Sequence, residues 1–171
     1  MAFRQAVTSD DMRILAILEG AKRHLRAMGV DQWQTGYPDL AAVRGDIDNG
    51  EAYVLEEGDD LAAAFTLSFR GEPSYATLNG GEWENNGEYG VVHRMAIADA
   101  FRGAGLSARL FAEIERLCRA KGVGGIKADT HPDNKQMQRL LEKHSYVFRG
   151  TIFFDGGDKL AYEKAFSRPK H

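Results

Sequence analysis

The sequence predicts a mixed α/β fold with one sheet of about seven strands and helices on both of its faces. Two observations lead to this prediction. Apolar residues recur at helical spacing in some segments, and they form short strand-like runs in others. The elements then follow in the order strand, two helices, three strands, helix, strand, helix and two strands, which favours a layered sheet covered by helices.

Length and composition favour a single domain across residues 1–171. The chain is 43% hydrophobic, which is enough for a core, and no repeat or linker marks a boundary. A net charge of -3 argues against nucleic acid or anionic membrane as a partner. Cys118 is the only cysteine, so we expect it to pack on a helix face and we expect no metal site. No apolar run resembles a signal peptide or membrane span, which predicts a cytoplasmic protein.

In the first half of the chain, Ser9 is a suitable N-cap because two aspartates follow it, and Gly29 ends the helix. Gly58 marks the turn of a hairpin. The expected elements are a strand at 3–7, a helix from Ser9 to Met28, a helix at 40–50 and two strands within 51–70.

In the second half, a helix beginning at Leu106 has an apolar stripe at helical spacing. A polar connection as long as 71–89 is more often functional or mobile than idle. The expected elements after it are a strand at 89–97, a helix from Leu106 to Lys121, a strand at 124–130, a helix at 133–144 and strands at 146–154 and 159–166.

A glycine-rich junction separates the strand at 89–97 from the following helix. Gly103 and Gly105 would let a ligand approach the backbone, and the first turn of a helix attracts phosphate. A plain turn with an exposed Arg102 is one alternative. Another is a dinucleotide-binding fingerprint formed with Ala108 and followed by Asp129, although the polar spacer "ADAFR" before Gly103 is unusual for it.

Two spaced motifs resemble the GNAT family of N-acetyltransferases. They are "MAIADAFRGAGLS" and "DNKQMQRLLEKHSY", and the resemblance covers residues 88–166. It implies a mixed, mostly antiparallel sheet and acetyl-CoA as co-substrate. It also implies transfer of an acetyl group to a primary amine of a small molecule or a peptide, with a homodimer left open. A longer acyl donor or another nucleophile remains an alternative.

The resemblance also implies where the co-substrate is held. Backbone amides of the glycine junction would hold the diphosphate, the preceding strand would pair with the pantetheine arm, and a later asparagine would contact the co-substrate. These residues are Arg102, Gly103, Ala104, Gly105, Leu106 and Ser107, then Met95, Ala96 and Ile97, and finally Asn134. Arg109 is expected to be a solvated helix residue.

Two positions depart from the family's pattern. Ser145 stands where glycine is usual, which affects a turn. Leu141 stands where a tyrosine often protonates the leaving thiolate, and leucine has no proton to donate. A thiol pKa of about 8.5 still makes thiolate departure feasible. Leu141 nevertheless keeps open a non-catalytic CoA-binding or regulatory module.

His93 is the candidate general base, because some members of the family carry a catalytic histidine two residues before the pantetheine triplet. Strand alternation predicts that Val91, His93, Met95 and Ile97 share one face. A histidine that merely fills space is the alternative. Other candidate bases are Glu82, Glu84 and Glu88, while Asp129 and His131 are expected near the cleft mouth.

Three large aromatic residues, Trp33, Tyr37 and Trp83, fall in segments expected to be loops. We expect each to clamp its loop onto the core. Lining an acceptor site is the alternative.

Overall fold

The structure, a computed structural model, describes residues 1–154 and 156–167. Its strands are β1 (Ala2–Gln5), β2 (Ala52–Glu57), β3 (Asp60–Ser68), β4 (Gly90–Ile97), β5 (Gly125–Thr130), β6 (Val147–Phe154) and β7 (Gly157–Ala165). Its helices are α1 (Asp11–Ala27), α2 (Leu40–Asp48), α3 (Leu106–Lys121) and α4 (Lys135–Lys143). Short 3-10 turns lie at η1 (Thr8–Asp10), η2 (Pro73–Thr77) and η3 (Asp99–Phe101).

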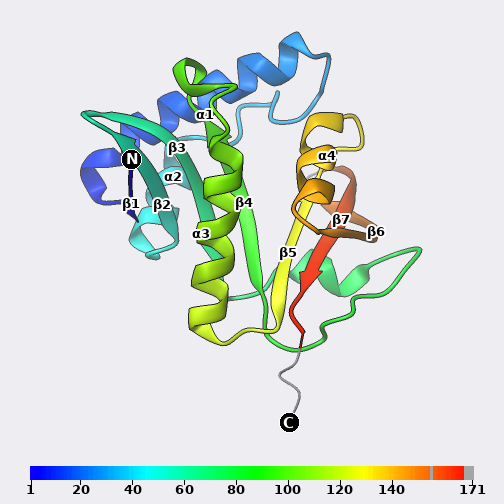
Figure 1. The fold of residues 1–171 in the computed structure, drawn as a ribbon. Helices are drawn as coiled ribbons and strands as arrows, with labels where there is room; N and C mark the ends of the chain where they lie inside the picture. Colours follow the sequence, from blue (N-terminus) through cyan, green and yellow to red (C-terminus); the bar gives the residue numbers. More distant parts are fainter. Residues whose placement is uncertain (155, 168–171) are drawn as a thin grey trace. The chain divides into compact units, whose positions relative to one another are not determined.

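The seven strands form one sheet in the order β1-β2-β3-β4-β5-β7-β6 (Figure 1). The pairs β1–β2, β2–β3, β5–β7 and β6–β7 are antiparallel. β4 and β5 are parallel, with Gly90 opposite Ile126 and Val91 opposite Lys127. The predicted mixed and mostly antiparallel sheet is therefore confirmed.

The chain divides into two compact units. Unit 1 comprises Met1–Leu67 and His93–Ser107, and unit 2 comprises Ser68–Val92 and the described residues from Ala108 onward. The division passes through β4 and through the first turn of α3. A single domain across residues 1–171 stays a prediction.

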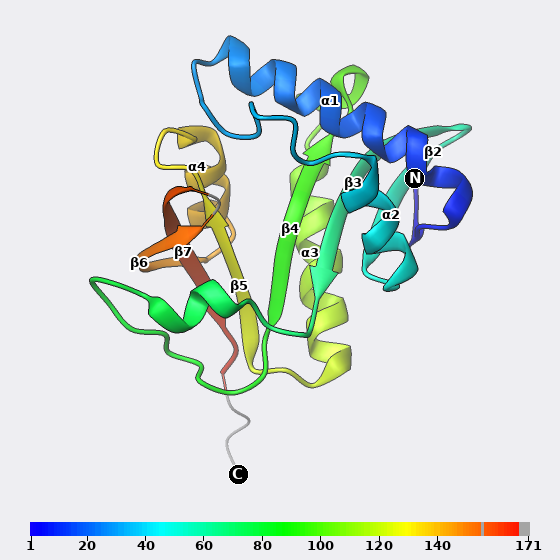
Figure 2. The same cartoon turned by 180° about the vertical axis from the view of Figure 1, so that it is seen from behind.

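Unit 1 has a core between its two helices and its strands. The stripe Ile14, Leu18 and Ala21 on α1 meets Val43 of α2 and Val54 of β2, and all five side chains are buried. α1 and α2 lie together over the unit 1 strands, as Figure 2 shows. The indole of Trp33 packs against the same core, which confirms the expected clamp.

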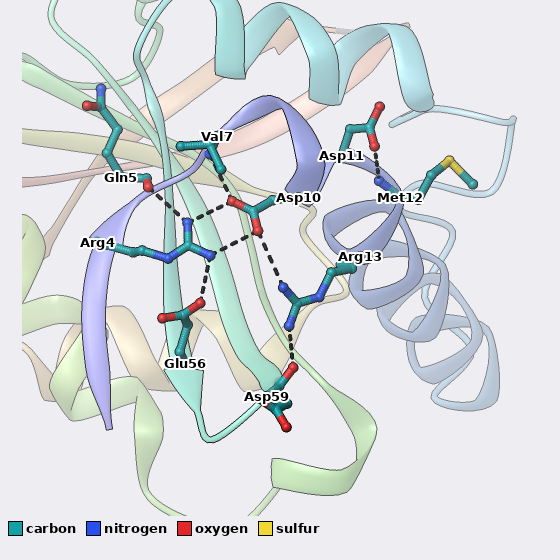
Figure 3. A network of polar contacts seen from close by, with 9 residues as sticks. All are labelled: Arg4, Gln5, Val7, Asp10, Asp11, Met12, Arg13, Glu56 and Asp59. Carbon is teal, nitrogen blue, oxygen red and sulfur yellow. Dashed lines mark hydrogen bonds and ion pairs between the residues drawn. The ribbon is translucent and has the colours of Figure 1, made fainter.

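The start of α1 differs from the sequence prediction. Ser9 is not its N-cap, because residues 8–10 form η1 and the helix begins at Asp11. Asp10 instead turns inward, where its carboxylate accepts hydrogen bonds of 2.7 and 2.9 Å from Arg4 and one of 2.8 Å from the Val7 amide (Figure 3). Arg4 also donates to Glu56 of β2 at 2.7 Å. The ion pair between Asp10 and Arg4, six residues apart, is thus present in place of the expected cap.

Unit 2 has its own core. On α3, Leu110 and Ile114 of the predicted stripe are fully buried, whereas Leu117 of the same stripe is only half-buried. Cys118 is fully buried on this helix, as expected, and burial raises the pKa of its thiol to about 12. α3 is tied to β7 by an ion pair of 2.6 Å between Glu115 and Lys164. Among residues 1–154 and 156–167, no helix is both long enough and apolar enough to cross a membrane.

The long polar segment at 71–89 is packed rather than loose. Tyr75 is buried in a cluster with Val91, and Trp83 packs against it while donating a 2.8 Å hydrogen bond to the Tyr75 carbonyl. The buried carboxylate of Glu163 accepts the backbone amides of Glu84 and Asn85 at 2.8 and 3.1 Å. Clamping of Trp83 onto the core is therefore confirmed, and its segment has a fixed course.

Candidate active site

The glycine junction between η3 and α3 has the backbone shape that its sequence predicted. Gly103 and Gly105 have φ angles of +77° and +74°, which L side chains rarely adopt. A Cβ built at either position would meet nothing within 4 Å. The two glycines therefore leave one side of the loop open for close approach.

The first turn of α3 adds electrostatic attraction to this open loop. The leading amides of a helix have no partner within the helix and carry a partial positive charge. Leu106, the first residue of α3, is buried and anchors that end. The segment from Arg102 to Ser107 therefore fits an anionic group such as a diphosphate.

The Arg102 side chain is engaged by an acid that sequence reasoning did not single out. Its Nε and Nη2 lie 3.1 and 3.0 Å from Oδ1 of Asp99 in η3. Asp99 also lies 3.7 Å from Arg23 of α1. Asp99 precedes Arg102 by one 3-10 turn, and this spacing in the sequence could have indicated the ion pair between them.

β4 carries the predicted pantetheine strand but is not regular. Arg94 has a φ of +49°, a left-handed conformation in the middle of the strand. Val91 and Val92 are both buried before it, while His93, Arg94 and Met95 are all half-buried. The predicted alternation across the whole strand is therefore wrong at Arg94, because the chain turns there.

The Arg94 side chain joins a buried network that sequence reasoning missed. Its Nε and Nη2 each donate a 2.6 Å hydrogen bond to Asp46 of α2, and Nη1 donates to the hydroxyl of Tyr37. Thr66 of β3 donates to the same carboxylate at 2.7 Å. Burial alone would lower the pKa of Arg94, but Asp46 and Tyr37 raise it overall. Tyr37, which was expected to clamp its loop onto the core, thus accepts a hydrogen bond from Arg94.

Within unit 1, the structure brings several predicted residues onto one continuous stretch of backbone. His93 directly precedes the turn at Arg94, Met95–Ile97 follow it, and the glycine loop begins five residues after Ile97. The Ala98 amide donates a 2.8 Å hydrogen bond to Ala62 of β3 and fixes the end of this strand. The set combines a histidine, the strand positions Met95–Ile97 and a helix start that favours an anion.

The remaining co-substrate residue lies in unit 2. Asn134 is buried and caps α4, with its Oδ1 accepting a 3.0 Å hydrogen bond from the Met137 amide. Leu141 is buried within α4. Ser145 adopts a φ of +70°, so it takes the conformation for which the family uses glycine. The predicted contact between Asn134 and the co-substrate stays a prediction.

The other candidate bases also lie in unit 2. Glu82, Glu84 and Glu88 are exposed, and Glu84 pairs with Arg149 at 2.7 Å. Asp129, in β5, accepts a 2.9 Å hydrogen bond from the hydroxyl of Tyr75, and burial raises the pKa of its carboxyl to about 6.

Two residues expected at the surface have local partners. His131 accepts a 3.0 Å hydrogen bond from the Asp133 amide through Nδ1. Arg109 pairs with Glu113 at 3.1 Å, and its half-exposed side chain agrees with a solvated helix residue.

Comparison with known proteins points to one family. A model of the acetyltransferase (GNAT) family matches residues 17–146. The chain is 26% identical over 148 residues to YesJ, described as an uncharacterized N-acetyltransferase, from Bacillus subtilis strain 168, covering 85% of this chain and 81% of that protein.

Solved structures agree. A GNAT-family acetyltransferase from Streptococcus agalactiae 2603 is 32% identical, with a TM-score of 0.84 over 98% of this chain and 96% of that one. A putative acetyltransferase from Staphylococcus aureus Mu50 is 26% identical, with a TM-score of 0.73 over 96% and 99% of the two chains.

Proposed function

This chain belongs to the GNAT family of acetyltransferases, and we propose that it transfers an acetyl group from acetyl-CoA to a primary amine of a small molecule or a peptide. The family as a whole uses acyl-CoA donors. One observation carries the proposal for this chain: the open, left-handed glycines at 103 and 105 stand at the start of α3, where a diphosphate is favoured.

The residues of the site divide into those that bind and those that move a proton. Backbone amides from Arg102 to Ser107 hold the diphosphate, and Met95–Ile97 pair with the pantetheine arm. Asn134 contacts the same arm near the diphosphate. The donor supplies an acetyl group activated as a thioester.

His93 and the strand after it assist the reaction. An alkyl amine with a pKa near 10.4 is mostly protonated at neutral pH, so a base is useful. His93 takes the proton that the amine loses as the C–N bond forms and the C–S bond breaks, and the thiolate keeps the electron pair. A backbone amide among Met95–Ile97 donates to the carbonyl oxygen as negative charge develops there.

A second candidate function has one observation in its favour. Leu141 is buried at the position where the family often has a proton-donating tyrosine. This favours a non-catalytic CoA-binding module. We favour catalysis, because a thiolate with a conjugate-acid pKa near 8.5 leaves without a dedicated acid. We further propose a cytoplasmic location, since a single cysteine is typical of a reducing compartment.

The experiment that separates the two functions measures thiol release. The protein is incubated with acetyl-CoA and a panel of small amines, amino acids and peptides, and the acetylated product is identified by mass. Equimolar thiol and N-acetyl product with at least one amine support the transferase. Tight CoA binding without thiol release above the rate of buffer would support the binding module.

A further inference from the structure

The backbone of Arg94 is held in a conformation that a β-strand does not require. Its φ of +49° lies in the left-handed region, which only a few per cent of non-glycine residues occupy. Such residues persist when the surrounding structure over-determines them, and they cluster at functional sites. Arg94 stands between His93 and Met95, the two positions that the proposed reaction uses most directly.

The side chain of Arg94 supplies the restraint. Two parallel hydrogen bonds of 2.6 Å join its guanidinium to the Asp46 carboxylate. Both side chains are mostly buried, with 15% and 13% of their surfaces exposed. A bidentate pair fixes direction as well as distance, because both groups are planar. Asp46 is itself held by Thr66, so α2, β3 and β4 share one junction.

The Arg94 side chain lines a small cavity in unit 1. This cavity, about 10 Å³, is lined by Asp46, Thr66 and Arg94 together with apolar side chains of the unit 1 core. Such a space holds about one water molecule. Because the guanidinium donates to Asp46 and Tyr37, Arg94 is placed to act through its own backbone.

We propose that Arg94 is a positioning residue, whose pair with Asp46 holds the left-handed turn of β4 and thereby directs the His93 side chain and the Met95 amide. The inference rests on the proposed function, because these two groups gain their importance from acyl transfer. Asp46 contributes indirectly, because it orients the guanidinium of Arg94.

Two substitutions at one position separate the side chain from the backbone. Arg94→Ala removes the clamp and keeps a Cβ that disfavours the left-handed turn. Arg94→Gly removes the same clamp but adopts this turn freely. We expect kcat to fall by about 5- to 150-fold in Arg94→Ala, the range that corresponds to the cost of a strained residue. The kcat of Arg94→Gly should be at least fivefold higher than the kcat of Arg94→Ala.

Affinity for acetyl-CoA and a matched control complete the kinetic test. The Kd for acetyl-CoA should rise by less than kcat falls in Arg94→Ala, since the diphosphate loop is untouched and only the pairing of Met95 with the pantetheine arm is disturbed. The Kd should return toward the wild-type value in Arg94→Gly. Arg44→Ala removes another arginine–aspartate pair of unit 1, in which Arg44 lies 2.9 Å from Asp11. Arg44 is more than half exposed, and its loss should leave kcat unchanged.

Backbone NMR provides a test that needs no acceptor, and it applies even if no acetyl transfer is detected. We expect the backbone amide resonances of His93 and Met95 to match the wild type in Arg94→Gly and to be displaced in Arg94→Ala. A wild type that acetylates no amine would refute the proposed function, while these resonances would still decide the role of Arg94. Equal kcat in the Ala and Gly variants, or resonances displaced equally in both, would overturn the inference.

Discussion

The hydroxyl of Tyr75 donates a 2.9 Å hydrogen bond to Oδ1 of Asp129, and this pair joins the long segment at 71–89 to β5. Burial disfavours the charged carboxylate and raises its pKa to about 6, although the Tyr75 hydrogen bond acts in the opposite direction. Unit 2 therefore contains a carboxyl that is easier to bury when protonated.

This relationship predicts how Asp129→Asn affects stability. The folded-state pKa lies above the ordinary value of 3.8, so stability is lost as pH rises from about 4 to 6. The amide of asparagine is uncharged and still accepts from Tyr75. We expect Asp129→Asn to raise the free energy of unfolding by on the order of 1–3 kcal/mol at pH 7, and by little at pH 4.

Urea unfolding at several pH values measures this effect. Asp158→Asn is the control, because Asp158 is exposed on β7 and should leave the difference between pH 4 and pH 7 unchanged. Equal destabilisation of Asp129→Asn at both pH values would place the effect in packing, and destabilisation at pH 7 alone would show that the charged form is needed.

The ion pair at the start of α1 predicts the opposite pH dependence. Arg4 lowers the pKa of Asp10 through two hydrogen bonds, although burial opposes this shift. The Arg4–Asp10 pair therefore contributes fully to the free energy of unfolding above about pH 4. This contribution is lost as pH falls through the folded-state pKa of Asp10. We expect Asp10→Ala to lower the free energy of unfolding by about 2–3 kcal/mol at pH 7, because Arg4 retains Glu56.

Chemical unfolding at pH 7 and at pH 3 tests this expectation, and the cost of Asp10→Ala should shrink at the lower pH. Glu57→Gln is a suitable control, since Glu57 is half-exposed and lies 3.4 Å from the N-terminal amine. A cost that is the same at both pH values would place the effect in packing rather than in charge.

His93 predicts the pH dependence of turnover. If His93 takes the proton of the amine, kcat should rise with pH as the imidazole loses its own proton. His93→Ala and His93→Gln should lower turnover by roughly 10²–10⁴-fold and leave the Kd for acetyl-CoA nearly unchanged. Because Leu141 does not ionise, no alkaline limb is expected from that position.

Turnover near the wild-type value in both His93 variants, with the acid limb intact, would remove histidine from the mechanism. Glu82 and Glu88 would then be tested before Glu84, whose carboxylate is already paired with Arg149.

Local signals in the sequence predicted most of the fold. The stripe on α3 predicted the burial of Leu106, Leu110 and Ile114, and Gly58 predicted the turn between β2 and β3. The glycines at 103 and 105 predicted the shape of their loop. Each of these signals involves residues that are close together in the sequence. At this range, residue type and spacing determine the backbone directly.

Contacts between distant residues could not be predicted in this way. Arg94 and Asp46 are 48 positions apart, and Tyr75 and Asp129 are 54 apart. No periodic pattern connects them, since each pair depends on the packing of several elements. The turn at Arg94 was missed for the same reason, because an arginine alone does not indicate a left-handed backbone.

The central claim is that the loop at 102–107 holds the diphosphate of acetyl-CoA, and Gly105→Asp tests it. The substitution places a negative side chain in open space but at a left-handed φ of +74°, so the fold should survive at a cost of about 1–2 kcal/mol. Gly122→Asp is the matched control, because Gly122 has a φ of +80° and equally open surroundings beyond the other end of α3. The measurement is the Kd for CoA by titration calorimetry. We predict micromolar binding by the wild type and Gly122→Asp, and loss of at least 100-fold in a folded Gly105→Asp. Unchanged affinity in Gly105→Asp, or binding of a nicotinamide dinucleotide in place of CoA, would contradict the account.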